Sequence, residues 1–92
     1  MMTPYIQKEN VETTELDGEW ILLNTEQLTI TKLNEVGGLC WSLLNKEQTA
    51  ESLALAVSEK FQSTEDKEKI KKDMKEFLSH LDECGLIENV NR

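Results

Sequence analysis

Among the side chains in this sequence that could act as a nucleophile or a general base are Cys40, Cys84 and the single histidine, His80. A nucleophilic cysteine needs a neighbouring base and a group that orients that base. Both cysteines instead fall on the apolar stripes of predicted helices, where a thiol behaves as a small hydrophobic side chain. His80 lies at the edge of one such stripe, a position typical of a histidine on a helix surface. The sequence therefore predicts no catalytic residues and a protein that is not an enzyme.

Metal ions and cofactors are not expected either. Two cysteines and one histidine at these spacings do not form a closed tetrahedral zinc site, and Gly37-Gly38 does not match a phosphate-binding loop. The longest apolar run, 20–23, is too short to span a bilayer, and the N-terminus lacks the apolar segment of a signal peptide. We therefore expect a cytoplasmic protein with reduced thiols, no cofactor and no membrane partner.

The charge of the chain argues against nucleic acid as a partner. The 92 residues carry 10 Lys and Arg against 18 Asp and Glu, a formal net charge of −8 at pH 7. Lysine and arginine contacts to phosphates supply most of the affinity for DNA, and no third of this sequence is net positive. An acidic helix-turn-helix regulator stays as an alternative, but the charge favours binding to a protein or peptide.

The first part of the sequence has the pattern of an antiparallel meander of short strands. Asp17-Gly18 suits a two-residue hairpin turn, because both residues tolerate positive φ angles. Leu28 and Ile30 then share one face of a segment with period two, and we expect that face to point toward the helices. The predicted strands cover residues 10–16, 19–23 and 28–32.

The remaining sequence has the period of amphipathic helices. Asn34 and Thr49 suit N-caps, Ser63 or Thr64 suits a third N-cap, and Gly85 suits a C-terminal stop. The predicted helices cover residues 34–44, 49–61 and 63 or 64 to 84, and a short strand or clasp follows at 86–87. The third helix carries a wide apolar face at Ile70, Met74, Phe77, Leu78, Leu81 and Cys84.

A glycine pair lies inside the first predicted helix. Gly37-Gly38 costs about 1 kcal/mol of helix stability per residue relative to alanine. Glycine lets a helix backbone approach a neighbouring element without an intervening Cβ. We therefore expect this helix to lie unusually close to a strand or another helix.

Together these elements predict an α+β fold of the winged helix-turn-helix type, in which a three-stranded antiparallel sheet is followed by three helices. We expect a single domain at 10–88, a flexible N-terminal arm at 1–9 and a C-terminal tail at 89–92. The third strand of a meander is an edge, and an edge offers unpaired N–H and C=O groups to an extended peptide. The edge of the third strand, beside the third helix, is thus a candidate binding surface.

Several short motifs, in their order along the chain, resemble the PqqD family of leader-peptide recognition domains in peptide natural-product biosynthesis. The resemblance covers residues 11–87 and rests on Asp17-Gly18, the strand from Trp20 to Asn24 that ends in Leu-Leu-Asn, Leu33-Asn34-Glu35-Val36-Gly37, Trp41 with Leu43-Leu44, Thr49-Ala50-Glu51, Asp73 with Phe77-Leu78 and Leu81, and Gly85-Leu86-Ile87. It implies a winged-helix-like domain that binds the leader of a ribosomally made precursor peptide as an added strand. It also implies delivery of that leader to modifying enzymes.

The resemblance further implies which residues contact the leader: Leu28, Thr29, Ile30, Thr31, Lys32, Asp73, Met74 and Phe77. Within the family, the chain looks most like the stand-alone leader-binding proteins of lasso-peptide pathways, whose partners are a leader peptidase and a cyclase. The alternative is the pyrroloquinoline quinone branch, a peptide chaperone for a radical SAM enzyme. Gly38, Cys40 and the turn at 46–48 depart from the usual family pattern, which leaves the branch open.

Overall fold

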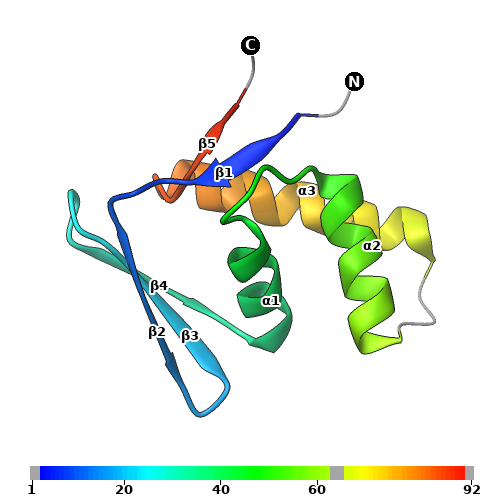
Figure 1. Ribbon diagram of the computed structural model, residues 1–92, viewed down its shortest axis with the longest axis horizontal. Coiled ribbons are helices and arrows are strands. Elements are labelled where there is room, and N and C mark those ends of the chain that lie inside the picture. The colour runs from blue at the N-terminus through cyan, green and yellow to red at the C-terminus, as the bar shows by residue number, and fades with distance from the viewer. Residues whose placement is uncertain (1–2, 63–65, 91–92) are drawn as a thin grey trace.

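The structure is a computed structural model that describes residues 3–62 and 66–90. A three-stranded antiparallel sheet in the order β2-β3-β4 is followed by three helices, which confirms the predicted α+β fold (Figure 1). The predicted caps at Ser63 or Thr64 lie outside the described residues. The elements are β1 (Tyr5–Gln7), β2 (Val11–Leu16), β3 (Glu19–Asn24), β4 (Thr29–Leu33), α1 (Glu35–Leu43), α2 (Ala50–Phe61), α3 (Lys67–Glu83) and β5 (Ile87–Asn89).

Two turns set the register of the main sheet. Asp17 and Gly18 have φ angles of 52° and 82° and pair Leu16 with Glu19, which confirms the predicted hairpin. The prediction that Leu28 begins the third strand is wrong. Leu28 lies in the turn before β4 with a φ of 57°, because its N–H donates to the Asn24 carbonyl oxygen at 2.7 Å and closes that turn.

The ends of the chain form a second sheet, which the sequence analysis missed. β1 pairs antiparallel with β5, with Ile6 opposite Glu88. The N–H of Tyr5 also donates to the Gln48 carbonyl oxygen at 2.8 Å. Residues 5–7 are therefore part of the folded unit and not the flexible arm that we expected at 1–9. The domain limits at 10 and 88 stay a prediction.

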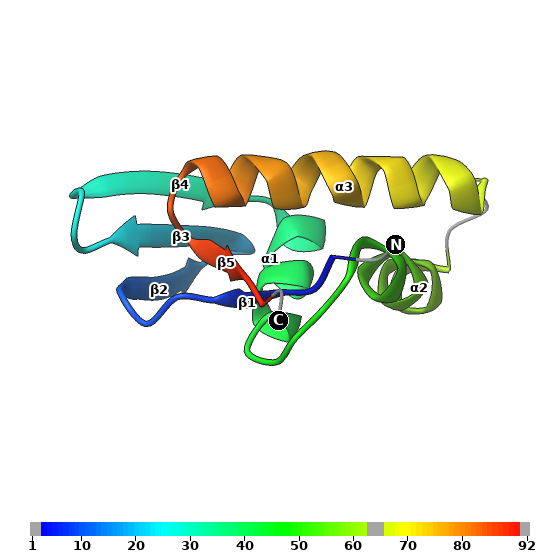
Figure 2. The same cartoon turned by 90° about the horizontal axis from the view of Figure 1, so that it is seen from above.

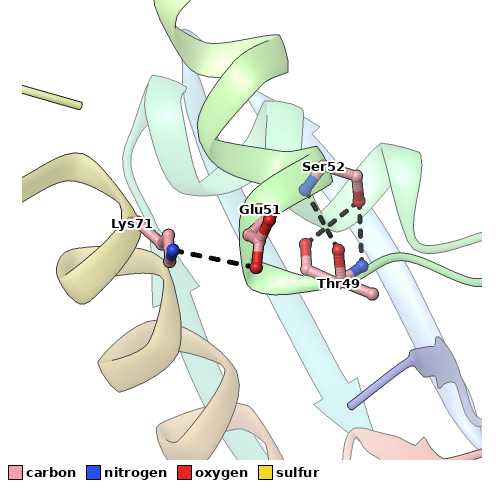
Figure 3. A network of polar contacts seen from close by, with 4 residues as sticks. All are labelled: Thr49, Glu51, Ser52 and Lys71. Atoms are coloured by element: carbon pink, nitrogen blue, oxygen red, sulfur yellow. Dashed lines mark hydrogen bonds and ion pairs between the residues drawn. The ribbon is translucent and has the colours of Figure 1, made fainter. Parts of the chain in front are cut away.

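The helix ends follow their sequence signals. The Asn34 side chain accepts a hydrogen bond from the Gly37 N–H at 2.8 Å, as expected of an N-cap. Thr49 and Ser52 bond to each other's backbone N–H and form a capping box at the start of α2 (Figure 3). At the end of α3, Gly85 has a φ of 72°, and the Leu86 N–H donates to the Leu81 carbonyl oxygen at 3.0 Å.

The core lies between the inner face of the main sheet and the three helices, with α1 in the middle (Figure 1). Cys40 on α1 is fully buried, and its Sγ lies 3.5 Å from the Met74 Sδ on α3. No helix in the described residues has the length and apolar character to cross a membrane. The buried apolar residues are Leu22, Cys40, Trp41, Leu44, Leu53, Ala54, Val57, Ile70, Met74, Leu78, Leu81, Leu86 and Ile87.

The surroundings of Gly38 explain why α1 contains a glycine there in spite of the helix stability that glycine costs. A Cβ built at Gly38 would lie 2.1 Å from the Trp20 Cδ1, so the indole of β3 lies directly against the helix backbone. This contact confirms the close approach that the glycine pair predicts. At Gly37 the same test gives a milder 3.2 Å to the Leu33 Cβ.

Gly38→Ala should lower the free energy of unfolding by about 2 kcal/mol, because the added methyl overlaps the Trp20 ring and forces it to move. Urea unfolding followed by tryptophan fluorescence measures this change. Gly37→Ala is the matched control, and it should be near neutral because helix propensity offsets the smaller overlap. Equal stability of the two variants would contradict the assigned role of Gly38.

Candidate peptide-binding site

β4 is an edge strand of the main sheet, with β3 on one side and no strand on the other among the described residues. Figure 2 shows β4 on the side of the sheet where α3 lies and β2 on the opposite side. A free edge of this kind is a template for an extended peptide. Which backbone groups it offers depends on the hydrogen-bonding register.

Two hydrogen bonds fix that register. The Thr25 N–H donates to the Asn10 carbonyl oxygen at 2.9 Å. Thr25, directly after β3, and the odd-numbered residues of β3 before it therefore direct their backbone groups toward β2. The Asn24 carbonyl oxygen accepts from Leu28 and therefore faces β4. Backbone groups alternate along a strand, and Leu22 pairs with Thr31. It follows that Thr29, Thr31 and Leu33 bond to β3, whereas Ile30 and Lys32 point their N–H and C=O groups to the free edge.

The side chains of β4 point opposite to our expectation. Ile30 is 65% exposed and lies on the outer face of the sheet, whereas Thr31 is half-buried on the inner face. The register causes this, because Thr31 pairs with the fully buried Leu22 on the inner face. The prediction that Leu28 and Ile30 face the helices is therefore wrong, and Leu28 is 78% exposed in its turn.

The three predicted site residues of α3 differ in accessibility. Met74 is buried in the core, Phe77 is half-buried and Asp73 is exposed. With 3.6 residues per turn, Asp73 and Phe77 lie on one flank of the buried stripe, and Lys71 and Lys75 lie on the other. Lys71 and Lys75 face the start of α2 and β1, because they line a cavity with Tyr5 and Ala50. Asp73 and Phe77 thus lie on the flank directed away from α2.

The side chain of Asn24 ties the start of β4 to the end of α3. It is 1% exposed, and its Oδ1 accepts hydrogen bonds from the Asn10 side chain at 3.1 Å and from the Glu26 N–H at 3.0 Å. Its Nδ2 donates to the Cys84 carbonyl oxygen at 3.1 Å. A Cβ at Gly85 would lie 3.0 Å from that nitrogen, so the glycine also makes room for the amide. Asn24 therefore sets where the β4 edge begins relative to α3.

Asn24→Ala should lower the free energy of unfolding by about 2–3 kcal/mol, because it removes a buried side chain and leaves several partly buried backbone and side-chain groups without its hydrogen bonds. Chemical denaturation measures the loss, and hydrogen exchange should show faster opening of the turn at 25–28. Asn10→Ala is the control, since it removes a single side-chain bond to the same oxygen. A loss no larger than that of the control would contradict the anchoring role.

Cys40 and His80 lie as the sequence analysis predicts, whereas Cys84 is half-buried at the C-cap of α3 and not on its buried stripe. Burial raises the pKa of the Cys40 thiol from 9.0 to about 11, which suppresses the thiolate that a nucleophile needs. Both cysteines are free, and the exposed His80 has its Nε2 3.9 Å from the Cys84 Sγ. Among residues 3–62 and 66–90, no group of three or more His, Cys, Asp or Glu side chains could hold a metal ion.

A cavity of about 480 Å³ lies on the other flank of α3, between β1 and the start of α2. The Lys71 Nζ lies 3.7 Å from the Glu51 Oε1 at this cavity (Figure 3). None of the eight predicted contact residues lines it. Strand addition needs a free backbone edge and not a cavity lined by side chains, so the geometry still favours β4 as the peptide site.

The sequence analysis identified the strand from Trp20 to Asn24 but missed that the side chains of these two residues position the site. In the sequence, Asn24 has the residue type of an ordinary turn residue, and the residues next to it do not indicate that its side chain is buried. Trp20 is one of two tryptophans, and its partner Gly38 was identified only as a residue that needs a close neighbour. Both contacts join residues more than ten positions apart, which local patterns do not report.

Comparisons with known proteins agree with this geometry. The family model described as coenzyme PQQ synthesis protein D (PqqD) matches residues 19–87. The structure of TbiB1 in complex with the TbiA(beta) leader peptide is similar, with a TM-score of 0.80 and 25% identity over 95% of this chain and 99% of that chain. A lasso peptide synthetase B1 complexed with the leader peptide has a TM-score of 0.78 and 14% identity over 91% and 96% of the two chains, a likeness of fold.

No curated protein matches the sequence. The family model nevertheless spans most of the chain, from β3 through the three helices to β5. It includes the free β4 strand and the apolar flank of α3. The chain therefore belongs to the PqqD family.

Proposed function

We propose that this protein recognises the leader segment of a ribosomally synthesised precursor peptide. The leader adds as a strand to β4 and bonds to the outward N–H and C=O groups of Ile30 and Lys32. The observation that carries the proposal is the free edge of β4 on the α3 side of the molecule (Figure 2). Two similar chains, TbiB1 and a lasso peptide synthetase B1, were solved with leader peptides, which supports the same ligand class here.

The inner face of the added strand supplies sequence selectivity. Guest side chains opposite Thr31 and Leu33 project toward the helices, on the side where α3 presents Asp73 and Phe77. Main-chain bonds give general affinity, and one or two apolar anchors packed against Phe77 give specificity. Met74 is buried in the core, so it helps to hold α3 in place and does not itself reach the leader. Leu28 and Thr29 contact the leader where it passes the turn before β4.

The role is binding and not catalysis. The protein holds the leader in the cytoplasm and presents the attached core peptide to a leader peptidase and a cyclase. Tethering raises the local concentration of the core peptide at those enzymes without any chemistry by this domain. One of the two similar solved chains, the lasso peptide synthetase B1, points to the lasso-peptide branch, whereas the family model carries the name of the quinone branch. We favour the lasso branch for this reason.

Ile30→Pro tests the strand-addition model. Proline removes the outward N–H that would donate a hydrogen bond to a carbonyl oxygen of the guest strand. An edge strand tolerates this loss. We expect a synthetic precursor leader to bind about tenfold more weakly to this variant than to the unchanged protein, measured by isothermal titration calorimetry. The circular dichroism spectrum should stay that of the native fold.

Two variants control this test. Ile30→Ala keeps the N–H and removes only the exposed side chain, so it should bind more tightly than the proline variant. Thr31→Pro removes an N–H that faces β3 and should destabilise the fold itself. Undiminished leader affinity in Ile30→Pro would contradict the proposed mode of binding.

A further inference from the structure

The outer face of the main sheet carries side chains that the proposed leader site does not use. The ladder places Ile30 opposite Leu23 and Lys32 opposite Ile21, all on the face away from the helices. Ile30 is 65% exposed, whereas Leu23 and Ile21 are half-buried. Ile30 therefore contacts Leu23 of β3 on one side and is open to solvent on the other side, at the free edge.

Lys32 is a positive charge without a carboxylate across the ladder. Its cross-strand neighbour is Ile21, and the next residue across, on β2, is Thr14. Within residues 3–62 and 66–90, the salt bridge found joins Lys71 to Glu51, and Lys32 takes part in none. The side chain is exposed at the edge of a protein whose net charge is −8. No carboxylate of the sheet lies directly across from Lys32, so a guest strand at the free edge is where a partner for this charge can be supplied.

We propose that the β4 edge selects leaders with an acidic side chain opposite Lys32 and an apolar side chain opposite Ile30. These two guest residues are two positions apart and share the outer face, and the residue between them points inward beside Thr31. Directly opposite residues have Cβ atoms about 4.5–5.5 Å apart, close enough for an ion pair and an apolar contact. The inference rests on the proposed function and names the peptide class that the edge would accept.

The two faces of a bound leader would then be read by different means. The inward residue meets α3, where Phe77 favours an apolar anchor. The outward pair meets Ile30 and Lys32, which read an apolar and an acidic side chain in a fixed register. A shift of the guest by one residue would exchange the faces and place the acidic side chain inward, near Asp73. Lys32 thus also sets the register in which the leader binds.

A charge-reversal experiment tests this proposal. The probe is a synthetic precursor leader that carries an acidic and an apolar residue two positions apart, labelled with a fluorophore and titrated with the 92-residue chain at low salt. Lys32→Glu should weaken binding about fivefold, since an attraction across the ladder becomes a repulsion. Replacing the acidic leader residue opposite position 32 by lysine should restore the lost affinity to Lys32→Glu and weaken binding to the unchanged protein.

Lys46→Glu is the matched control. It changes the net charge by the same amount at an exposed position in the turn between α1 and α2, and it should leave leader affinity within twofold. Equal weakening by Lys46→Glu and Lys32→Glu would overturn the inference, as would the absence of rescue by the lysine-substituted leader. Binding that Lys32→Glu leaves unchanged overturns this inference alone, whereas no saturable binding by any protein overturns the proposed function as well.

Discussion

The buried carboxamide of Asn24 is the interaction on which the geometry of the site depends. It accepts hydrogen bonds from the β3–β4 turn and from Asn10, and it donates to the carbonyl oxygen of Cys84 at the end of α3. One side chain therefore joins the start of the edge strand to the helix that lies on the same side. The other end of the sheet is fixed by Trp20 against the backbone of Gly38. These two contacts fix both ends of β4 in the sheet and leave its outer edge free.

The two edges of the main sheet differ in how open they are to a guest strand. β2 carries Glu12 and Glu15, both exposed, and charged residues on an edge discourage pairing with another chain. β4 offers Thr29, Ile30 and Thr31, with Lys32 as its one charged residue. In the part of the chain that the structure describes, four large apolar side chains are exposed, and two of them, Leu28 and Ile30, lie in β4 or in the turn before it, whereas Leu16 and Leu55 lie elsewhere. An apolar surface at the β4 edge is consistent with the proposed peptide site.

Local sequence signals predicted most of the fold, because caps, turns and apolar periods act over a few residues. Asp17-Gly18, Asn34, Thr49 and Gly85 all lie where their residue types predict. The errors came from contacts between distant segments. The pairing of β1 with β5 joins the two ends of the chain, and no local pattern reports it. The face of Ile30 was also assigned wrongly, because a five-residue strand carries too few apolar residues to define its inner side.

The sequence predicted which strand and which helix form the candidate site, but not the directions of their side chains and backbone groups. The meander made the third strand an edge, and the resemblance to PqqD proteins pointed to that edge and to the third helix. The outward direction of the Ile30 and Lys32 backbone groups needed the hydrogen bonds at Asn24 and Thr25. Those bonds depend on tertiary packing around a buried asparagine, which residue type alone does not reveal.

The most direct measurement of the central claim is an NMR study of the protein with the isotope-labelled synthetic leader. Our account predicts intermolecular NOEs between leader backbone protons and the amides of Ile30 and Lys32, with chemical-shift changes in Phe77. It also predicts slowed exchange of those two amides in the complex. Leader contacts confined to β2, or to the cavity between β1 and α2, would contradict strand addition at β4.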